Sequence, residues 1–369
     1  MQKKLVIIGA NDFQNQLILK AKERGIETHV FAWREGAVGE KTADYFYPIS
    51  IIEKEKILKE CMEIKPDGIV SIASDLATIT VNYVAEKMNL IGNGIESSLI
   101  ATNKYLMRKA FSRAGDPSPK FYCSEEMTSE LIDKLEYPVI VKPSDRSGSR
   151  GIMKVDKKQN LMEAIEVAKK LSFEHKAIIE EFIEGEEYSV EYISYKGKHY
   201  FLALTKKYTT GSPHFIETGH VQPAEVSDIV LDNIKKIVEH ALDTLMIKNG
   251  ASHSEIKINS EGSIKIVEIG GRMGGDCIGS DLVQISTGYD FVNMVIDVAC
   301  GQEPKFEKKS LPQKAEVRFI FSEEDINELK KIQQFNPESI YRISEIESIR
   351  KDNLVTDSST RYGYYILRG

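Results

Sequence analysis

Short apolar runs alternate with longer amphipathic stretches in the first part of the chain. The apolar runs at residues 4–8, 28–33 and 68–72 predict buried strands, because each contains β-branched or aromatic residues and ends in a turn signal. The stretches at residues 14–24, 53–64 and 77–88 have apolar positions at helical spacing and predict helices. Strands that alternate with helices are typical of a parallel sheet flanked by helices. We therefore expect an α/β domain over residues 1–97.

The pattern changes after this domain. Residues 96–114 predict one helix, which the turn sequence GDPSP at residues 115–119 ends. Strands are then expected at residues 137–143, 152–155 and 177–183, with a helix over residues 161–171. Near the C-terminus, residues 315–321 predict a strand and residues 323–335 a helix.

Two β-prone runs at residues 255–258 and 263–269, separated by the turn sequence NSEG, predict a tight hairpin. With an even loop, Ile258 pairs with Ser263 and Glu255 lies opposite Ile266, so Glu268 lies diagonally from Glu255 on the same face. Two carboxylates at that spacing could hold one or two divalent ions. A slip of one residue would separate them, and a hairpin alone is also typical of a solvated surface.

Composition and charge narrow the function classes. The chain has 369 residues, enough for two to four domains, and its net charge of −7 comes with scattered lysines and arginines. We therefore expect no nucleic-acid partner and no anionic membrane surface. The first apolar run is far shorter than the roughly 20 residues of a membrane span. Four cysteines without a Cys-x-x-Cys pair predict reduced thiols and a cytoplasmic setting, with Cys277 as a packing residue.

Several isolated features have an ordinary interpretation as well as a functional one. The first turn reads GAND, without G-x-G-x-x-G, so a nicotinamide cofactor is not expected. We interpret Ser74 and Asp75, at the carboxyl end of the third strand, as helix caps rather than ligand contacts. Lys104 and Arg108 lie one turn apart and are interpreted as a solvated basic face.

The loop at residues 144–151 lies between two strands and is not a P-loop, because no helix follows it and it lacks the lysine of that motif. Its glycines and serines could fold over phosphates as a lid, with Lys142 as a neutralising charge. By itself, such a loop is equally typical of a surface hairpin.

Five segments taken in order resemble the ATP-grasp superfamily: Lys104, PVIVKPSDRSGSRG at residues 138–151, EEFIEGEEYSVE at 180–191, HSEIKI at 253–258 and VEIGGRMGG at 267–275. Within it, the chain is similar to the carboxylate-amine ligases, including the bacterial L-amino acid ligases and one half of a carbamoyl-phosphate synthetase large subunit. The resemblance covers essentially the whole chain.

The fold class that the resemblance implies is α/β and α+β multidomain. A Rossmann-like parallel sheet at residues 1–97 would precede an ATP-grasp fold, whose two α+β subdomains grip ATP. These would comprise a small lid subdomain with its linker helix at residues 98–184 and a central catalytic subdomain at 185–309. A small C-terminal subdomain would occupy residues 310–369.

The resemblance also assigns the nucleotide contacts. Lys104 and Lys142 match the two lysines that contact phosphates. The matching flexible loop contains Ser147, Gly148 and Gly151, and adenine would lie against the segment of Glu181, Phe182 and Ile183. Glu187 would receive the ribose hydroxyls, with Glu186 as the second choice, although both would otherwise be read as an acidic surface turn.

Glu255 and Glu268 match the metal-binding acidic pair of the superfamily, and Arg272 matches the arginine that faces the transferred phosphoryl group. Lys142 and Arg272 are therefore the expected catalytic residues. The expected cofactors are ATP and one or two Mg²⁺ ions, with Mn²⁺ as an alternative. One departure is Gly270, where the common pattern Glu-x-Asn has an asparagine. This departure puts the full coordination of a second magnesium in question, although water could replace the amide oxygen.

The expected reaction is ATP-dependent amide or peptide bond formation through an acyl phosphate, with small-molecule carboxylate and amine substrates. The resemblance to L-amino acid ligases places Glu217 and His220, in the segment at residues 209–224, near the α-amino group of an amino acid substrate together with Arg272. A structural loop with one satisfied histidine is the alternative for that segment. An ATP-dependent carboxylase, a carrier-protein acyl ligase and a non-catalytic nucleotide sensor remain open, as does a homodimer.

Overall fold

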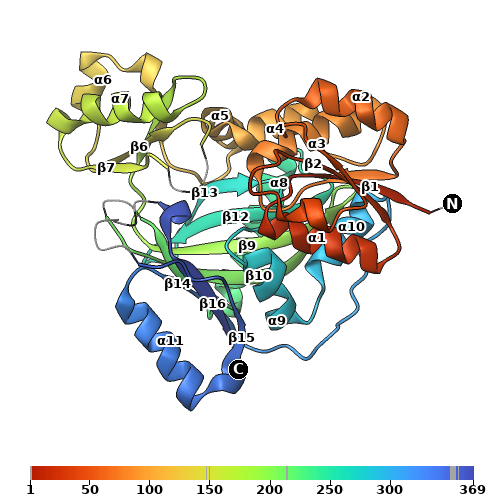
Figure 1. Ribbon diagram of the computed structural model, residues 1–369. Coiled ribbons are helices and arrows are strands. Elements are labelled where there is room, and N and C mark those ends of the chain that lie inside the picture. The colour runs from red at the N-terminus through yellow and green to blue at the C-terminus, as the bar shows by residue number, and fades with distance from the viewer. Residues whose placement is uncertain (1, 147, 149, 213–214, 350–354, 356) are drawn as a thin grey trace.

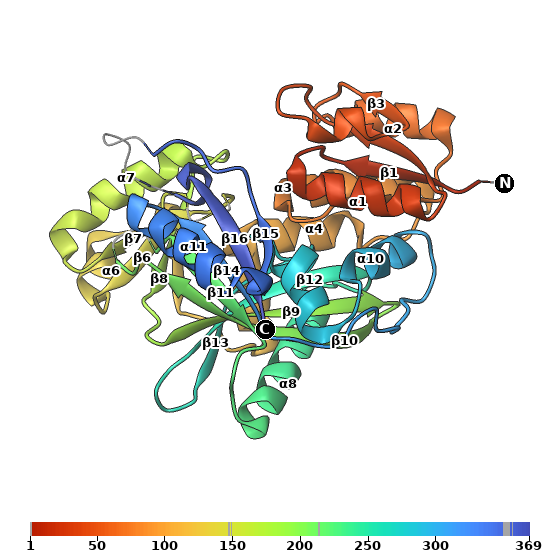
Figure 2. The same ribbon diagram turned by 60° about the horizontal axis from the view of Figure 1, so that its bottom comes forward.

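The structure is a computed structural model, and it describes residues 2–369 except 147, 149, 213–214, 350–354 and 356. Figures 1 and 2 show an N-terminal α/β unit and a small sheet with its helices on either side of one end of a larger central sheet. This mixed architecture confirms the expected fold class.

The N-terminal sheet is parallel, with the strand order β3-β2-β1-β4. Three of its strands were predicted, and the short strand β3 was not. The strands are β1 (Lys4–Ile8), β2 (Glu27–Phe31), β3 (Tyr45–Tyr47) and β4 (Gly68–Val70), and the helices are α1 (Asp12–Glu23), α2 (Lys54–Ile64) and α3 (Asp75–Met88). Leu5, Val6, Ile7 and Ile8 are fully buried in β1, which explains its continuous apolar run.

The helix predicted over residues 96–114 is two helices, α4 (Gly94–Thr102) and α5 (Lys104–Ala114). Asn103 separates them with an extended backbone, and its side chain accepts a hydrogen bond from the amide of Leu106 at 3.1 Å. Asparagine is among the preferred N-cap residues, so it starts a new helix here. The interpretation of Lys104 and Arg108 as a solvated basic face was wrong as well, because Lys104 is 5% exposed and Arg108 is fully buried.

The small sheet has the order β5-β8-β6-β7 and is antiparallel throughout. Its strands are β5 (Phe121–Cys123), β6 (Val139–Pro143), β7 (Met153–Val155) and β8 (Ala177–Glu181), with helices α6 (Ser129–Lys134) and α7 (Leu161–Leu171). Val141 and Ile179 pack with Leu161 and Ile165 of α7 in one core. The loop after Lys142 connects β6 to β7, as the sequence predicted.

The central sheet has eight strands in the order β13-β12-β9-β10-β11-β14-β16-β15. They are β9 (Glu186–Tyr195), β10 (Lys198–Thr209), β11 (Glu217–Gln222), β12 (Gly250–Ile258), β13 (Ile264–Gly270), β14 (Ala315–Ile320), β15 (Ile340–Ile343) and β16 (Gly363–Arg368). The helices of this part are α8 (Asp228–Thr244), a π-helical turn at Ile278–Leu282, α9 (Val283–Thr287), α10 (Phe291–Ala299) and α11 (Glu323–Phe335). Short 3₁₀ turns occur at Val38–Lys41, Ser124–Glu126, Lys158–Asn160, Pro337–Ser339 and Ser358–Thr360.

The three sheets can be compared with the expected domains. The first lies within residues 1–97 and the second within 98–184, whereas the third includes strands from both 185–309 and 310–369. The expected C-terminal segment therefore extends the central sheet, and its boundary at residue 310 stays a prediction.

The register of the β12–β13 hairpin differs from the expected one. Ile258 pairs with Ile264, not with Ser263, and a bulge between Glu255 and Ile256 places Glu255 directly opposite Glu268. The pairing of Glu255 with Ile266 was wrong because the loop has an odd length and β13 contributes one extra residue at the bulge. Directly opposite residues share a face, so the two carboxylates lie closer than the diagonal arrangement implied.

Candidate functional site

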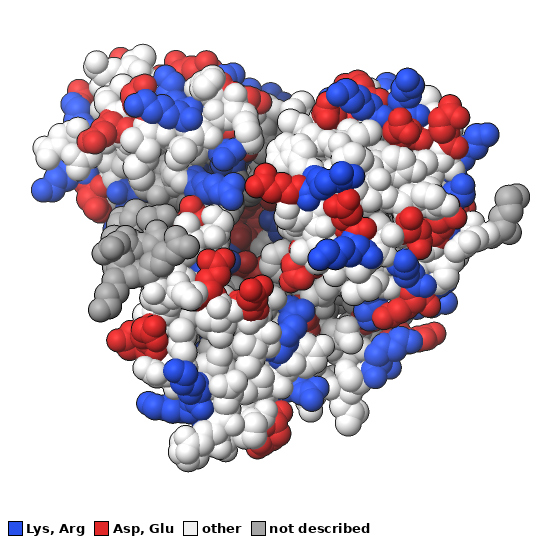
Figure 3. Space-filling view, in the orientation of Figure 1, with Lys and Arg blue, Asp and Glu red and all other residues white. Residues whose placement is uncertain are grey.

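A cavity of about 300 Å³ lies where the three sheets meet. Figure 3 shows the hollow on this face of the molecule, with acidic and basic side chains around it. The predicted site residues that line it are Lys104, Lys142, Gly148, Glu181, Phe182, Ile183, Glu187, Glu217, His220, Glu255, Glu268 and Arg272. Residues far apart in the sequence thus converge on one cavity.

Of the other two predicted loop residues, Ser147 lies outside the described residues, and Gly151 is not in this wall. Gly151 has a φ of +72°, and an added Cβ would lie 2.6 Å from Cδ1 of Leu171, so it packs at the base of the loop. Glu186, the second choice for the ribose, pairs with Lys206 at 2.5 Å and is largely exposed, whereas Glu187 lines the cavity.

The cationic side of the cavity is built on a buried cluster. Lys142 Nζ lies 2.7 Å from Glu180 Oε2, and Arg108 Nε lies 2.8 Å from the other oxygen of Glu180. Burial lowers the pKa of Lys142, and the nearby Glu180 carboxylate opposes this shift only in part. Burial raises the pKa of Glu180, but Arg108 and Lys142 outweigh it and keep the carboxylate ionised. Lys104 Nζ donates to Glu268 at 2.9 Å.

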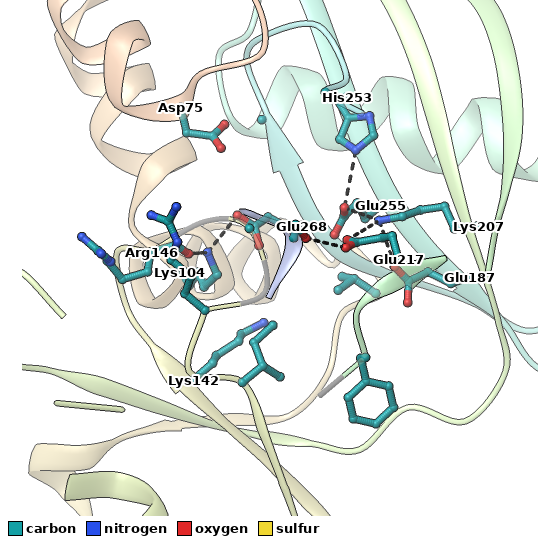
Figure 4. A pocket seen from close by; sticks show the side chains of 18 of the residues that line it. Asp75, Lys104, Lys142, Arg146, Glu187, Lys207, Glu217, His253, Glu255 and Glu268 are labelled. Carbon is teal, nitrogen blue, oxygen red and sulfur yellow. Dashed lines mark hydrogen bonds and ion pairs between the residues drawn. The ribbon is translucent and has the colours of Figure 1, made fainter. Parts of the chain in front are cut away.

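The acidic side surrounds a lysine that sequence reasoning missed. Lys207 Nζ lies 2.6 Å from Glu255, 3.0 Å from Glu187 and 3.7 Å from Glu217, and Figure 4 shows its side chain pointing among them. Burial would lower the pKa of Lys207, but the three carboxylates raise it well above its ordinary value. The sequence did contain a signal, because adjacent lysines in a strand point to opposite faces and one of Lys206 and Lys207 had to face inward.

His253 and Glu191 fix the turn that follows β13. Glu191 is fully buried; one oxygen lies 2.5 Å from His253 Nδ1, and the other accepts from the amide of Gly274 at 3.0 Å. Burial lowers the pKa of His253, but Glu191 and Glu255 outweigh it and raise this pKa to about 9. The imidazolium therefore lies between two carboxylates at neutral pH.

The two residues interpreted as helix caps behave differently. Ser74 is the N-cap of α3 and accepts from the amide of Ala77 at 3.3 Å, as expected. Asp75 lines the cavity and forms an ion pair with Arg272 at 2.8 Å, so its interpretation as a cap was wrong. No sequence motif marked this contact, since Asp75 begins helix α3 and Arg272 lies in the turn after β13, far away in the sequence.

The expected substrate residues lie on β11 beside the C-terminal segment. Ser358 Oγ donates to Glu217 at 2.8 Å, and Arg361 donates to both oxygens of Asp276 at 2.7 and 2.9 Å. His220 Nε2 lies 3.9 Å from Asp276, too far for a hydrogen bond. Neither ring nitrogen of this buried histidine has a hydrogen-bond partner among the described residues, and Asp276 is its ionic neighbour. The role of His220 stays a prediction.

Glu255 and Glu268 present oxygen ligands of the kind that hard divalent cations prefer, so their chemistry fits a magnesium site. Within the described part of the chain, no cluster of three or more His, Cys, Asp or Glu side chains forms a preassembled metal site.

Cys277 is buried, and burial raises the pKa of its thiol to about 12, as a packing residue requires. No helix in the described ranges is long and apolar enough to span a bilayer.

Comparisons with known proteins agree with this arrangement. Residues 135–281 match the family model described as the ATP-grasp domain. The chain is 27% identical over 307 residues to an alanine–anticapsin ligase of Bacillus subtilis, covering 73% of this chain and 64% of that protein. It is 29% identical over 194 residues to a dapdiamide A synthase of Enterobacter agglomerans, covering 50% and 45%. The chain thus spans less than two thirds of the length of these relatives.

Solved structures show the same fold. An L-amino acid ligase from Bacillus licheniformis superposes with a TM-score of 0.82 at 23% identity, covering 100% of this chain and 93% of that one. A phosphoribosylglycinamide synthetase from Anaerococcus prevotii gives a TM-score of 0.78 at 22% identity, covering 100% and 94%. At these identities the likeness concerns the fold alone.

Proposed function

We propose that this chain, whose residues 135–281 match the ATP-grasp domain, is an ATP-dependent carboxylate-amine ligase acting on an amino acid. One observation carries this proposal. Paired lysines, paired carboxylates and an arginine line the same cavity as Glu217 and the buried His220. Similar proteins are named as ligases that join an amino acid to another compound, which supports the same reaction class.

The nucleotide would lie between the small sheet and the central sheet. Lys104 and Lys142 would neutralise its phosphates, and the segment of Glu181, Phe182 and Ile183 would contact adenine. Glu187 would receive the ribose hydroxyls, since it lines the cavity and Glu186 does not. Arg146, Gly148 and Arg150 also line the cavity, which supports a role for this loop in excluding water from a hydrolysable intermediate.

Glu255 and Glu268 would hold one or two Mg²⁺ ions, or Mn²⁺ as an alternative. When bound, the metal would neutralise the negative charge that spreads over the transferring phosphoryl group. Both carboxylates pair with lysines, Glu255 with Lys207 and Glu268 with Lys104. Burial would raise the pKa of Glu255, but Lys207 lowers it, and the two ion pairs hold both carboxylates on the same side of the cavity.

In the proposed reaction, a substrate carboxylate oxygen attacks the γ-phosphorus of ATP, and ADP leaves. The amine then attacks the carbonyl carbon of the acyl phosphate, loses a proton and displaces inorganic phosphate. Arg272 would stabilise charge on the transferring group, and Glu217 would attract the α-ammonium of the amino acid. His220 is buried, which lowers its pKa, so it would offer a neutral hydrogen-bonding group.

All four cysteines are free thiols, which supports a reducing compartment such as the cytoplasm. A homodimer stays a prediction.

The test is phosphate release from Mg²⁺-ATP with the twenty L-amino acids, singly and in pairs, followed by mass spectrometry of the products. A peptide or amide mass that appears with ADP and phosphate would establish the reaction. Turnover that requires bicarbonate or an acyl-carrier protein would favour the carboxylase or carrier-protein ligase instead. ATP binding without stimulated hydrolysis would favour a nucleotide sensor.

The substrate assignment has its own control. Glu217→Ala should abolish amino-acid-dependent turnover, whereas Glu225→Ala, at an exposed position after the same strand, should leave it unchanged. Equal turnover in the wild type and Glu217→Ala would show that Glu217 does not bind the substrate.

A further inference from the structure

The arginine expected to face the phosphoryl group is held by a residue of the N-terminal domain. Arg272 Nε donates to Asp75 Oδ1 at 2.8 Å, and its Nη2 donates to Asp75 Oδ2 at 3.0 Å. Asp75 is the first residue of α3, and Arg272 lies in the turn after β13. Both side chains are largely buried, with 17% and 16% exposed. A two-point contact of this kind fixes the plane of the guanidinium group as well as its position.

The contact leaves part of the guanidinium available. Of its five N–H groups, the Nε–H and one on Nη2 bind Asp75, and one on Nη1 donates to the carbonyl oxygen of Met273 at 3.2 Å. One N–H on each Nη atom therefore has no partner among the described residues. Paired N–H groups at the end of a guanidinium suit two oxygens of a phosphoryl group.

Gly270 explains how Asp75 reaches the arginine. A Cβ at residue 270 would lie 2.8 Å from Asp75 Oδ1 and 3.2 Å from Arg272 Nε. The first of these distances is shorter than real Cβ contacts, so a side chain at this position would force the Asp75 carboxylate to move from its place beside Arg272. The glycine that departs from the Glu-x-Asn pattern thus supplies the space for the Asp75 carboxylate, which approaches from another domain.

We propose that Asp75 is a positioning residue: it holds Arg272 so that the free end of the guanidinium faces the transferring phosphoryl group, and Gly270 is required to admit it. This inference rests on the proposed function, because it concerns phosphoryl transfer at the same site. The charge state of the Asp75 carboxylate agrees with this positioning role. Burial raises the pKa of Asp75, but Arg272 and Lys104 outweigh it, so the carboxylate is ionised and can hold the cation.

Two other roles for Asp75 would give different results. A purely structural link between domains would affect stability without a specific effect on turnover. A direct contact with the ammonium of a substrate would affect the KM for that substrate and leave kcat intact.

The first experiment measures steady-state turnover and nucleotide affinity in Asp75→Ala and Asp75→Asn. Since a displacement of about 1 Å at such a site can reduce the rate about 10²-fold, we expect kcat to fall on that order. The dissociation constant of ATP and its KM should change less than about threefold, because the ion pair of Asp75 is with Arg272, whereas Lys104 pairs with Glu268 and Lys142 with Glu180. Asp75→Asn should lose nearly as much as Asp75→Ala, because asparagine is uncharged and has an NH₂ donor in place of one of the two carboxylate oxygens that accept from Arg272.

Ser74→Ala is the matched control. It removes the N-cap of the same helix but leaves the contact with Arg272 in place, so kcat should stay within about threefold of the wild type. An equal loss of kcat in Ser74→Ala, or a loss confined to the KM of the amino acid in the Asp75 variants, would overturn the proposal.

The second experiment uses Gly270. Gly270→Ala should lower kcat to the level of Asp75→Ala, because its Cβ displaces the ion pair. The double variant Asp75→Ala/Gly270→Ala should be no slower than Asp75→Ala, since the new methyl group then meets no carboxylate. A full multiplication of the two single losses would show that Gly270 acts independently of Asp75 and would overturn that part of the inference.

A third measurement separates the contact from the proposed activity. The melting temperatures of Asp75→Ala, Arg272→Ala and the double variant should form a non-additive set, with the double variant less destabilised than the sum, because each single variant leaves one buried charge unpaired. Additive shifts would show that the pair is not formed. If the pair is formed but the wild type turns over none of the substrates, the proposed function fails while the contact stands.

Discussion

Glu180 offers the sharpest test of how the cationic side of the cavity is stabilised. It lies on β8, is 4% exposed and bridges two buried cations, at 2.8 Å from Arg108 and 2.7 Å from Lys142. At an effective dielectric constant of about 20, each attraction is about 6 kcal/mol before desolvation is subtracted. The measured cost of removing one partner of a buried pair is about 3–5 kcal/mol. We expect Glu180→Gln to lower the free energy of unfolding by that amount.

The substitution should also change nucleotide binding. Burial lowers the pKa of Lys142, and Glu180 opposes this shift, so its removal should lower the pKa further. A larger fraction of Lys142 is then neutral as the pH rises. The KM for ATP should therefore increase with pH more steeply in Glu180→Gln than in the wild type.

The assay is urea unfolding at pH 7, followed by circular dichroism. Glu181→Gln is the matched control, because it changes the next residue of the same strand, whose side chain is 36% exposed and pairs with Lys265 at 2.7 Å. An exposed pair of this kind contributes about 0–1 kcal/mol. If Glu180→Gln unfolds within about 1 kcal/mol of Glu181→Gln, the buried cluster does not stabilise the fold as argued.

Three further predictions concern other parts of the site. Lys207→Met should lower the melting temperature, because Glu187 and Glu217 lose the lysine and Glu255 keeps only His253. Mg²⁺ should raise that temperature more in the variant than in the wild type, as thermal unfolding with and without MgCl₂ would show. His253 has a pKa raised from its ordinary 6.5 to about 9, so its ion pair stabilises the fold fully below pH 6.5 and loses that effect as the pH rises toward 9. His253→Gln should therefore unfold in urea with a flatter stability profile over this pH range, and an unchanged profile would contradict the assignment. Arg361→Ala should raise the KM for the amino acid about tenfold, because Arg361 donates to the carbonyl oxygen of Glu217 at 3.4 Å and holds Asp276 beside His220. The ATP dissociation constant should stay unchanged, as parallel kinetic and equilibrium measurements would show.

The sequence predicted the parts of the fold that local patterns determine. Apolar runs identified three of the four N-terminal strands, and the order of the segments identified the fold class. Local patterns did not give the register of the β12–β13 hairpin, because a bulge after Glu255 depends on pairing with the partner strand. They also missed the break at Asn103, whose side chain competes with the helix by capping the next one.

In the candidate site, too, the residues within local motifs were predicted and the residues that depend on tertiary contacts were missed. Lys104, Lys142 and Glu255 lie within recognisable motifs, and the structure brings them to one cavity. Asp75 and Lys207 lie outside those motifs, because their surroundings come from strands that are distant in the sequence. Burial against a tertiary partner determines their role, and no single sequence window contains that information.

The missing Cβ of Gly270 also constrains how this sequence can diverge. Its φ lies outside the region that favours glycine, so the need for a small residue here comes from the Asp75 carboxylate and not from the backbone. A chain with asparagine at position 270 would have to place the Asp75 carboxylate elsewhere. Among homologues, we therefore expect glycine at position 270 to occur together with aspartate at position 75, although the two positions are distant in the sequence.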